Sequence, residues 1–458
     1  MSGLAAIGLL LTTATQFRLS GLPVGPGEAF LLLWIGASLI QQTYRSGSLL
    51  TPAFSWMLTF WAVFAVAESI GALTGYVIGY PHDSGLFLHD VMAYPLMAAF
   101  SCLSLAGPEA ASRLNRTAWT LVTVGAACLV PMLAAGWGLT DLPFMSPWFG
   151  DRFRGWSNNP NQLAFLCALL VLITLHLADR ATQWTSWVLA VLCFMPAYFV
   201  GRLTKTDTFT FAILAGAAVF PVIKIRFWFI SARFGHVLRP RLAILAVIGL
   251  PLTLVAFSPF LMSVADDPQA LAAGMMKNGG KEAKEESALR LQLWGEAFDR
   301  GVQSGLLGLG PGPHLPIPVS IIGARNQERD LDTGDHPAVN GLPNFEAHNT
   351  FLDLFTQGGL LAVLCFASLV ATGAISSYRA RLAGLVAIVT GLFMFALTDL
   401  IVREPIFWFG IALSLVACNS TARAGGLAGF TARRRAEPGP GAGQRGGLRS
   451  GFGRSSIR

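Results

Sequence analysis

The sequence is poor in charge. Asp, Glu, Lys and Arg make up only 12% of its 458 residues, whereas 53% are hydrophobic and the mean hydropathy is +0.56. Soluble domains carry about 25% charged residues. This shortage therefore argues against a soluble domain and indicates a membrane protein.

Cysteine pairs and a cleavable signal are also missing. The six cysteines lie inside apolar stretches without a C-x-x-C neighbour, so they indicate neither a disulfide framework nor a zinc site. The N-terminal apolar stretch has no basic segment before it and no A-x-A cleavage site. We therefore interpret this stretch as a retained span.

Long apolar runs recur from one end of the chain to the other. Runs of about 17 to 25 residues have the length that crosses a bilayer. They predict an all-α, polytopic membrane protein with about 12 transmembrane helices. The predicted spans cover residues 4–16, 27–41, 52–78, 87–106, 118–137, 160–178, 185–201, 207–223, 242–264, 348–374, 383–402 and 405–419.

The charges of the loops set the orientation, because cytoplasmic loops collect Lys and Arg. With the Arg-rich C-terminal tail inside, both termini are predicted to be cytoplasmic. Attraction of the basic loops and tail to anionic lipid then accounts for the net charge of +7 without nucleic acid. The predicted parts are transmembrane helices with short loops over 1–265, a large periplasmic loop with short helices over 266–347, C-terminal transmembrane helices over 348–420, and a disordered basic cytoplasmic tail over 421–458.

Two short predicted outer loops carry two cations each, and Lys and Arg beside a span on that side are unusual. Arg152 and Arg154 precede a span in "GDRFRGWSNNPNQLAF", and Arg202 and Lys205 lie at a break between spans in "YFVGRLTKTDTF". A simpler role is open to each: the first two arginines could extend to lipid headgroups, and Arg202 could bind carbonyls at a helix end. Asn161, in the same Asn-rich segment, could have no role beyond capping a helix.

The large outer loop carries a further arginine. Residues 287–300 predict an amphipathic helix, and Arg290 lies on the flank of its apolar stripe. The segment "LLGLGPGPHLPIP" follows, with glycines that permit tight turns and prolines that exclude a helix. Arg290 could be an ordinary solvated residue, but a loop of this length with its own helix is more often functional than a spacer.

A His-Asn pair stands where this loop returns to the membrane. His348 and Asn349 join the polar segment "GLPNFEA" to the apolar span "TFLDLFTQGG". They could be no more than a polar helix start and its cap. Alternatively, a neutral imidazole at this depth could take a proton from an acceptor hydroxyl.

Four acids lie within predicted spans. A carboxylate there is costly unless it is paired, and the sequence identifies no partner for any of them. They are Glu68, Asp90, Asp353 and Asp399.

The outer cations and His348 together predict an anion site with a base beside it. Arginine binds phosphate through a planar fork of donors, so several arginines could hold a diphosphate and offset its charge as it leaves. Such a site suits group transfer from a lipid diphosphate. The predicted cations are Arg152, Arg154, Arg202, Lys205 and Arg290.

A metal motif is suggested only weakly. The segment "DLDTGD" contains Asp330, Asp332 and Asp335. A calcium loop requires Gly at its sixth position and Glu at its twelfth, whereas Gly334 is fifth here and Gly341 is twelfth. We therefore expect transfer without a metal or other cofactor.

These segments resemble the O-antigen ligase and O-antigen polymerase superfamily of bacterial envelope proteins. The similar pieces lie between residues 150 and 375, in the order typical of that family. They are "RGWSNNPNQLAF", "GRLTKTDTF", "RLQLWGEAFDRG" with "GLLGLGPG", and "HNTFLDLFTQGGLLAVL".

The resemblance implies a GT-C-like fold in the bacterial inner membrane and a metal-independent, inverting glycosyltransferase with its site facing the periplasm. The implied donor is a glycan on undecaprenyl diphosphate, and the acceptor is lipid A-core or another glycan. By this resemblance Arg154, Arg202 and Arg290 bind the diphosphate, and His348 is the base or orients the acceptor. Ligase, polymerase and protein O-glycosylation remain open, as does the oligomeric state.

Two other functions compete with this interpretation. A transporter or flippase of lipid-linked sugars would place paired polar residues near the bilayer midplane and interrupt its helices. A peptidoglycan-type glycan polymerase would depend on a loop Asp, such as Asp299 or Asp332, more than on His348.

Overall fold

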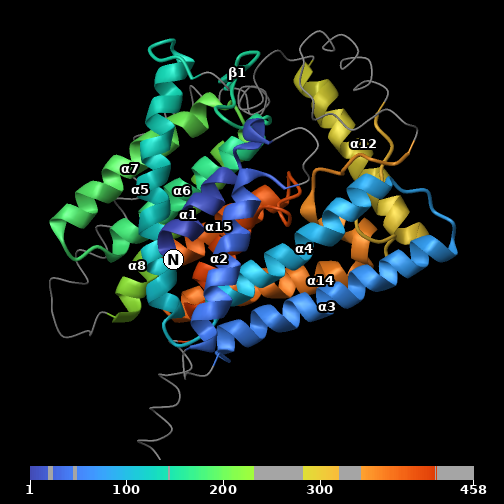
Figure 1. Ribbon diagram of the computed structural model, residues 1–458, viewed down its shortest axis with the longest axis horizontal. Coiled ribbons are helices and arrows are strands. Elements are labelled where there is room, and N and C mark those ends of the chain that lie inside the picture. The colour runs from blue at the N-terminus through green and yellow to red at the C-terminus, as the bar shows by residue number, and fades with distance from the viewer. Residues whose placement is uncertain are drawn as a thin grey trace, which may run out of the picture.

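The computed structural model describes residues 1–18, 24–44, 49–142, 145–231, 282–318, 342–417 and 419, and within them the chain is mostly helical (Figure 1). The predicted span 242–264, the basic tail 421–458 and the loop segments 266–281 and 319–341, which contain Asp330, Asp332 and Asp335, lie outside the described residues. The helices are α1 (Ser2–Leu11), α2 (Pro26–Thr43), α3 (Pro52–Val77), α4 (Ser84–Leu105), α5 (Ala110–Gly136), α6 (Pro160–Arg180), α7 (Trp184–Leu203), α8 (Asp207–Ser231), α12 (Glu282–Gln303), α14 (Thr350–Arg379), α15 (Ala383–Ala396) and α16 (Pro405–Leu415). A 3₁₀ turn, η1 (Thr15–Phe17), and a short hairpin of β1 (Trp148–Phe149) and β2 (Arg152–Phe153) complete the described elements.

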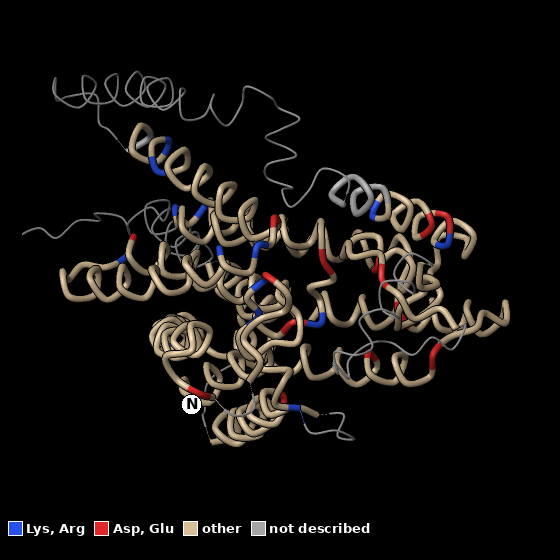
Figure 2. Tube along the Cα trace, turned by 90° about the horizontal axis from the view of Figure 1, so that it is seen from above, with Lys and Arg blue, Asp and Glu red and all other residues tan. Residues whose placement is uncertain are grey.

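Seven of the described helices, α3 to α8 and α14, are long and apolar enough to cross a membrane, and α1, α15 and α16 are shorter apolar helices. Figure 2 shows these helices uncharged over most of their length. The structure therefore confirms an all-α membrane protein with several spanning helices. The total of about 12 spans and the side on which the large loop lies stay predictions.

Helix starts follow local sequence signals. Four of them have a capping side chain whose oxygen accepts a hydrogen bond from the first turn: Thr51, Asp83, Asn159 and Asn349. Proline occupies the first turn of α2, α3, α6 and α16, where its missing N–H costs nothing. These signals explain why most predicted spans and observed helices begin within a few residues of each other. The exception is α5, which has no capping side chain and begins at Ala110, eight residues before the predicted span 118–137.

Helix α6 lies at the centre of the bundle. Of the 18 most apolar consecutive residues in α6, 78% are buried, whereas the corresponding share in the other six spanning helices is 22–39%. A helix that is apolar on all sides is typical of such a buried position. The polar residues at the start of α6, including Asn161, are consequently surrounded by the ends of other helices.

Helices α3, α4 and α14 run side by side, and α12 lies beside the start of α14 (Figure 1). α12 is the amphipathic helix expected over 287–300. Its buried residues Leu293 and Ala297 pack against Leu315, Phe345 and Ala347. This packing joins α12 to the end of the large loop, and the rings of Phe298 and Phe355, 5.9 Å apart between centroids, join α12 to α14.

Helix α14 is broken at Gly359, whose backbone has φ 66° and ψ −161°. The Gly-rich loop after α12 fills the break: Leu309 N–H donates to the Thr356 carbonyl at 2.7 Å, and Gly310 N–H donates to the Gln357 carbonyl at 2.8 Å. Leu360 N–H in turn donates to a carbonyl of this loop at 2.9 Å. The loop thus satisfies backbone groups that an interrupted membrane helix would otherwise leave unpaired.

Replacing Gly71 with alanine should destabilise the protein by about 1–3 kcal/mol or more. Gly71 lies on α3 against the break, and a Cβ atom there would lie 2.1 Å from the Gln357 carbonyl oxygen. Gly36→Ala in α2 is the matched control, because a Cβ there meets nothing within 4 Å. Thermal unfolding of the purified variants in detergent measures both effects, and equal unfolding temperatures would contradict the close approach of α3 to the break.

Candidate functional site

Several helix ends meet at one end of the bundle, which we call the polar end. It consists of the end of α7, the starts of α6, α8 and α14, and the connection 397–404 between α15 and α16. Thr208 Oγ1 at the start of α8 donates to Thr398 Oγ1 at 2.9 Å. Thr350 Oγ1 at the start of α14 donates to the Asp399 carbonyl at 2.6 Å. The connection 397–404 is therefore the common support of the polar end.

Arg152 is bound into this end from the β hairpin. Its Nη2 donates to Asn161 Oδ1 at 2.7 Å and to Thr206 Oγ1 at 3.1 Å, and its Nε donates to the Thr204 carbonyl at 3.1 Å. The structure thus brings together two predicted residues, Arg152 and Asn161. Asn161 therefore binds Arg152, in addition to lying next to the cap of α6.

Lys205 lies at the same corner. Its Nζ contacts Asp151 Oδ2 at 2.5 Å, and both side chains are exposed. The hydrogen bond from Lys205 lowers the pKa of Asp151. Lys205 adopts a left-handed backbone with φ 52°, which turns the chain sharply between α7 and α8.

Arg154 and Arg202 bind other partners. Arg154 is buried, with Nε donating to the Ser146 carbonyl at 3.0 Å and the guanidinium 5.6 Å from the centre of the Phe149 ring. Arg202 is exposed and donates from Nη1 to Thr210 Oγ1 at 2.9 Å. Arg154 therefore binds residues of the hairpin segment, and Arg202 links α7 to α8.

The His-Asn pair lies at the polar end. Asn349 caps α14 and also donates from Nδ2 to the Leu397 carbonyl at 3.0 Å. His348 is half-buried, has a left-handed backbone with φ 51°, and packs edge-on against the Phe345 ring at 5.4 Å between centroids. A non-glycine residue held in this region is strained, and such strain is found more often at functional sites.

Asp399 is joined to the residue after this pair, because its carbonyl accepts the hydrogen bond from Thr350 Oγ1. The predicted span 383–402 is longer than α15, which ends at Ala396, so Asp399 follows the helix in the connection. Burial raises the pKa of Asp399 to about 7, although the charges of Arg290 and Arg152 lower it and those of Glu346 and Glu404 raise it. Arg290 and Arg152, predicted from separate segments, therefore act on the same carboxylate.

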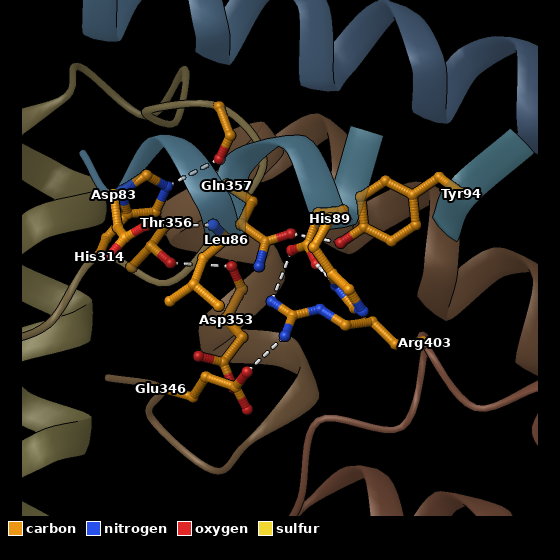
Figure 3. A network of polar contacts seen from close by, with 12 residues as sticks. Asp83, Leu86, His89, Tyr94, His314, Glu346, Asp353, Thr356, Gln357 and Arg403 are labelled. Carbon is orange, nitrogen blue, oxygen red and sulfur yellow. Dashed lines mark hydrogen bonds and ion pairs between the residues drawn. The ribbon is translucent and has the colours of Figure 1, made fainter. Parts of the chain in front are cut away.

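A second polar cluster centres on Arg403 (Figure 3). Arg403 Nη2 contacts Asp90 Oδ2 at 2.6 Å, and Nη1 contacts Glu346 Oε1 at 2.5 Å. His89 Nδ1 lies 3.1 Å from the other oxygen of Asp90. Burial alone would lower the pKa of Arg403, but the carboxylates of Asp90 and Glu346 raise it above its ordinary value.

The remaining intramembrane acids border the same cluster. Asp353 accepts from the N–H groups of Ala347 at 2.8 Å and Asn349 at 3.2 Å, so its partners are backbone groups. Tyr94 donates to Gln357 Oε1 at 2.5 Å, as Figure 3 shows. Glu68 is buried beside them on α3, and the charges of Asp90 and Arg403 act on it.

The sequence interpretation did not use Arg403 or the connection that carries it. A signal was present, because "TDLIVREP" places an acid, an Arg-Glu pair and a proline between two short apolar runs. Charged residues at such a position need partners from other helices. Only the fold identifies those partners, since Asp90 lies on α4.

The polar end can hold an anion and move a proton. Two arginines, Arg152 and Arg290, supply positive charge beside Asp399, and the α14 start adds an imidazole from His348. A carboxyl group that titrates near neutral pH suits general acid–base catalysis. The Arg403 cluster is linked to this end through the connection 397–404.

A scan against protein-family models and a search of curated proteins find no match to this chain.

Proposed function

We propose that this protein is a membrane glycosyltransferase that acts on an undecaprenyl-diphosphate-linked glycan at the periplasmic face, as an O-antigen ligase or polysaccharide polymerase does. The observation that carries the proposal is that Arg152 and Arg290 both bring positive charge to the buried Asp399 beside His348 and Asn349. The acceptor is a glycan or lipid A-core.

In the proposed reaction the acceptor hydroxyl oxygen attacks the anomeric carbon of the donor glycan. The bond from that carbon to the diphosphate oxygen breaks, and its electron pair leaves with the lipid diphosphate. The hydroxyl proton passes to His348 or Asp399. Arg152 and Arg290 offset the negative charge that grows on the leaving diphosphate, which is the main electrostatic need of this step.

The rate of transfer should rise with pH through about 7 if Asp399 is the base, because its pKa is about 7 and only the ionised carboxylate accepts a proton. Asp399→Asn should remove this limb of the pH profile and lower the rate by about 100- to 10,000-fold. Initial rates in detergent across pH measure both. An unchanged limb in Asp399→Asn would assign the titration to another group, with His348→Ala as the companion variant.

The function itself is tested by an envelope glycan profile of a deletion strain. Complementation with wild type, His348→Ala or Arg152→Ala separates lipid A-core, lipid-linked intermediates and secreted polymer. Full-length chains on undecaprenyl diphosphate with bare lipid A-core identify a ligase, whereas single repeat units identify a polymerase. Full complementation by both variants, at wild-type expression, would refute the proposed site.

A transporter of lipid-linked sugars is a second candidate, because one observation favours it. The Asp90–Arg403 pair lies among helices α3, α4 and α14, and α14 is interrupted at Gly359. Paired polar groups and broken helices are typical of transporters. Lipid-linked glycan stranded on the inner leaflet of the deletion strain would favour transport over transfer.

A further inference from the structure

Glu68 is a buried acid without a described partner. It lies near the middle of α3 with 5% of its surface exposed, and neither Oε1 nor Oε2 has a hydrogen-bond partner among the described residues. Its Oε1 faces the break in α14, since a Cβ atom at Gly358 would lie 2.8 Å from it. The carboxyl group therefore points into the interior between α3 and α14.

The neighbours of Glu68 do not supply a spare positive charge. Arg403 is the cation that acts on Glu68, and it already contacts Asp90 and Glu346. Asp353 on α14 adds a further carboxylate, which backbone N–H groups bind. Carboxylates thus outnumber the guanidinium in a buried cluster, and Glu68 is the one that the cluster leaves uncompensated.

The other titratable groups on the helices and loops packed against Glu68 do not supply the positive charge that it lacks. Tyr94 on α4 donates to Gln357 on α14. His89 is occupied by Asp90 on the side away from Arg403. His314, in the loop that fills the α14 break, is neutral near pH 7, because burial lowers its pKa to about 4.

We propose that Glu68 is a proton-binding site inside the membrane domain, and that its proton occupancy is transmitted by Arg403 to the connection 397–404. A buried carboxylate without a partner is expensive, and taking up a proton removes that cost. A proton needs one oxygen, whereas Na⁺ or Ca²⁺ needs several ligands, and the nearby oxygens of Tyr94 and Gln357 are already bonded to each other at 2.5 Å.

The link to the polar end follows from competition for one guanidinium. When Glu68 is protonated, Arg403 keeps its contacts with Asp90 and Glu346. When Glu68 loses its proton, its carboxylate attracts Arg403 away from these partners. Arg403 lies four residues after Asp399 in the same connection, so its movement displaces the support of the polar end. The inference holds whether the protein is a transferase or a transporter.

Infrared difference spectroscopy of the full chain in nanodiscs tests the site directly. Wild type near pH 7 should show the C=O stretch of a protonated carboxylic acid, shifted by H₂O/D₂O exchange. Glu68→Gln should reduce this band, and the control Asp399→Asn should keep the part that Glu68 contributes, because Asp399, with its pKa of about 7, is itself partly protonated at this pH. An equal band in wild type and Glu68→Gln, or the absence of any such band in wild type, overturns the proposal.

The unfolding temperature across pH gives a second test that uses the same samples. The native state holds a proton that the unfolded chain releases, so the unfolding temperature of wild type should fall as the pH rises from about 4.5, where the unfolded carboxyl ionises, until the native group also ionises. Glu68→Gln, which is neutral at every pH, should show a smaller fall. Equal slopes refute the proton site. If NaCl, but not choline chloride, restores wild type at high pH and has no effect on Glu68→Gln, the site holds a cation and the proposal is wrong.

Discussion

Replacing Arg403 with methionine should lower the free energy of unfolding by about 3–5 kcal/mol. The substitution keeps an unbranched apolar stem but leaves Asp90 and Glu346 without the guanidinium that contacts them at 2.6 and 2.5 Å. The side chain of Asp90 is 1% exposed, so water cannot replace the lost partner. Chemical unfolding in detergent, followed by tryptophan fluorescence, measures the change.

Arg18→Met is the matched control for this prediction. Arg18 contacts Glu28 at 2.7 Å, but 36% of its side chain is exposed, so the pair should contribute only about 0.2–1 kcal/mol. A double variant that also replaces Asp90 with asparagine should regain part of the stability lost in Arg403→Met, because it removes the uncompensated charge. If Arg403→Met and Arg18→Met destabilise equally, the buried cluster is not the support that the structure indicates.

The helices could be predicted from the sequence because their causes are local. Apolar runs of spanning length, a cap such as Asn159 or Asn349 and a proline in the first turn all lie within one segment. The amphipathic stripe of residues 287–300 likewise identified α12. Each of these signals needs no knowledge of where the neighbouring helices lie.

The partners of the intramembrane acids could not be predicted, because they come from distant segments. Asp90 meets Arg403 across most of the chain, and Glu68 lies beside the break at Gly358 and Gly359. A single sequence shows that an acid in a span needs a partner but not which residue supplies it. The break itself was equally hidden, since adjacent glycines in an apolar run fit a continuous helix.

The candidate site could be predicted only in part. The loop pattern predicts an outer position for Arg152 and Arg290, but their common effect on Asp399 depends on how the fold brings their distant segments together. Arg202 shows the reverse case, since it was predicted in the same kind of outer loop as Arg152 but its exposed side chain contacts Thr210 instead. The loop pattern predicts that these cations lie on one side of the membrane. The packing of the helices decides which of them act on the same group.

Arg290→Ala should lower the rate of glycosyl transfer by about 30- to 1,000-fold, which corresponds to about 2–4 kcal/mol of transition-state stabilisation. Arg290 lies on α12 four residues before Trp294, whose Nε1 donates to the Ala347 carbonyl at 3.1 Å next to His348. The helix therefore presents this arginine at the start of α14. Single-turnover transfer from a synthetic lipid-diphosphate donor measures the chemical step apart from product release.

The same substitution should shift the pH profile, and this shift separates a role at the site from a loss of folding. The charge of Arg290 lowers the pKa of Asp399, so its removal should move the rising limb to higher pH. Arg290→Lys keeps the charge but loses the planar fork, and should restore the position of the limb without restoring the full rate. Arg300→Ala, on the same helix in an i,i+4 pair with Glu296, should change neither. A uniform loss of rate in all three variants, with no movement of the limb, would mean that α12 supports the fold and that Arg290 does not act on the reacting groups.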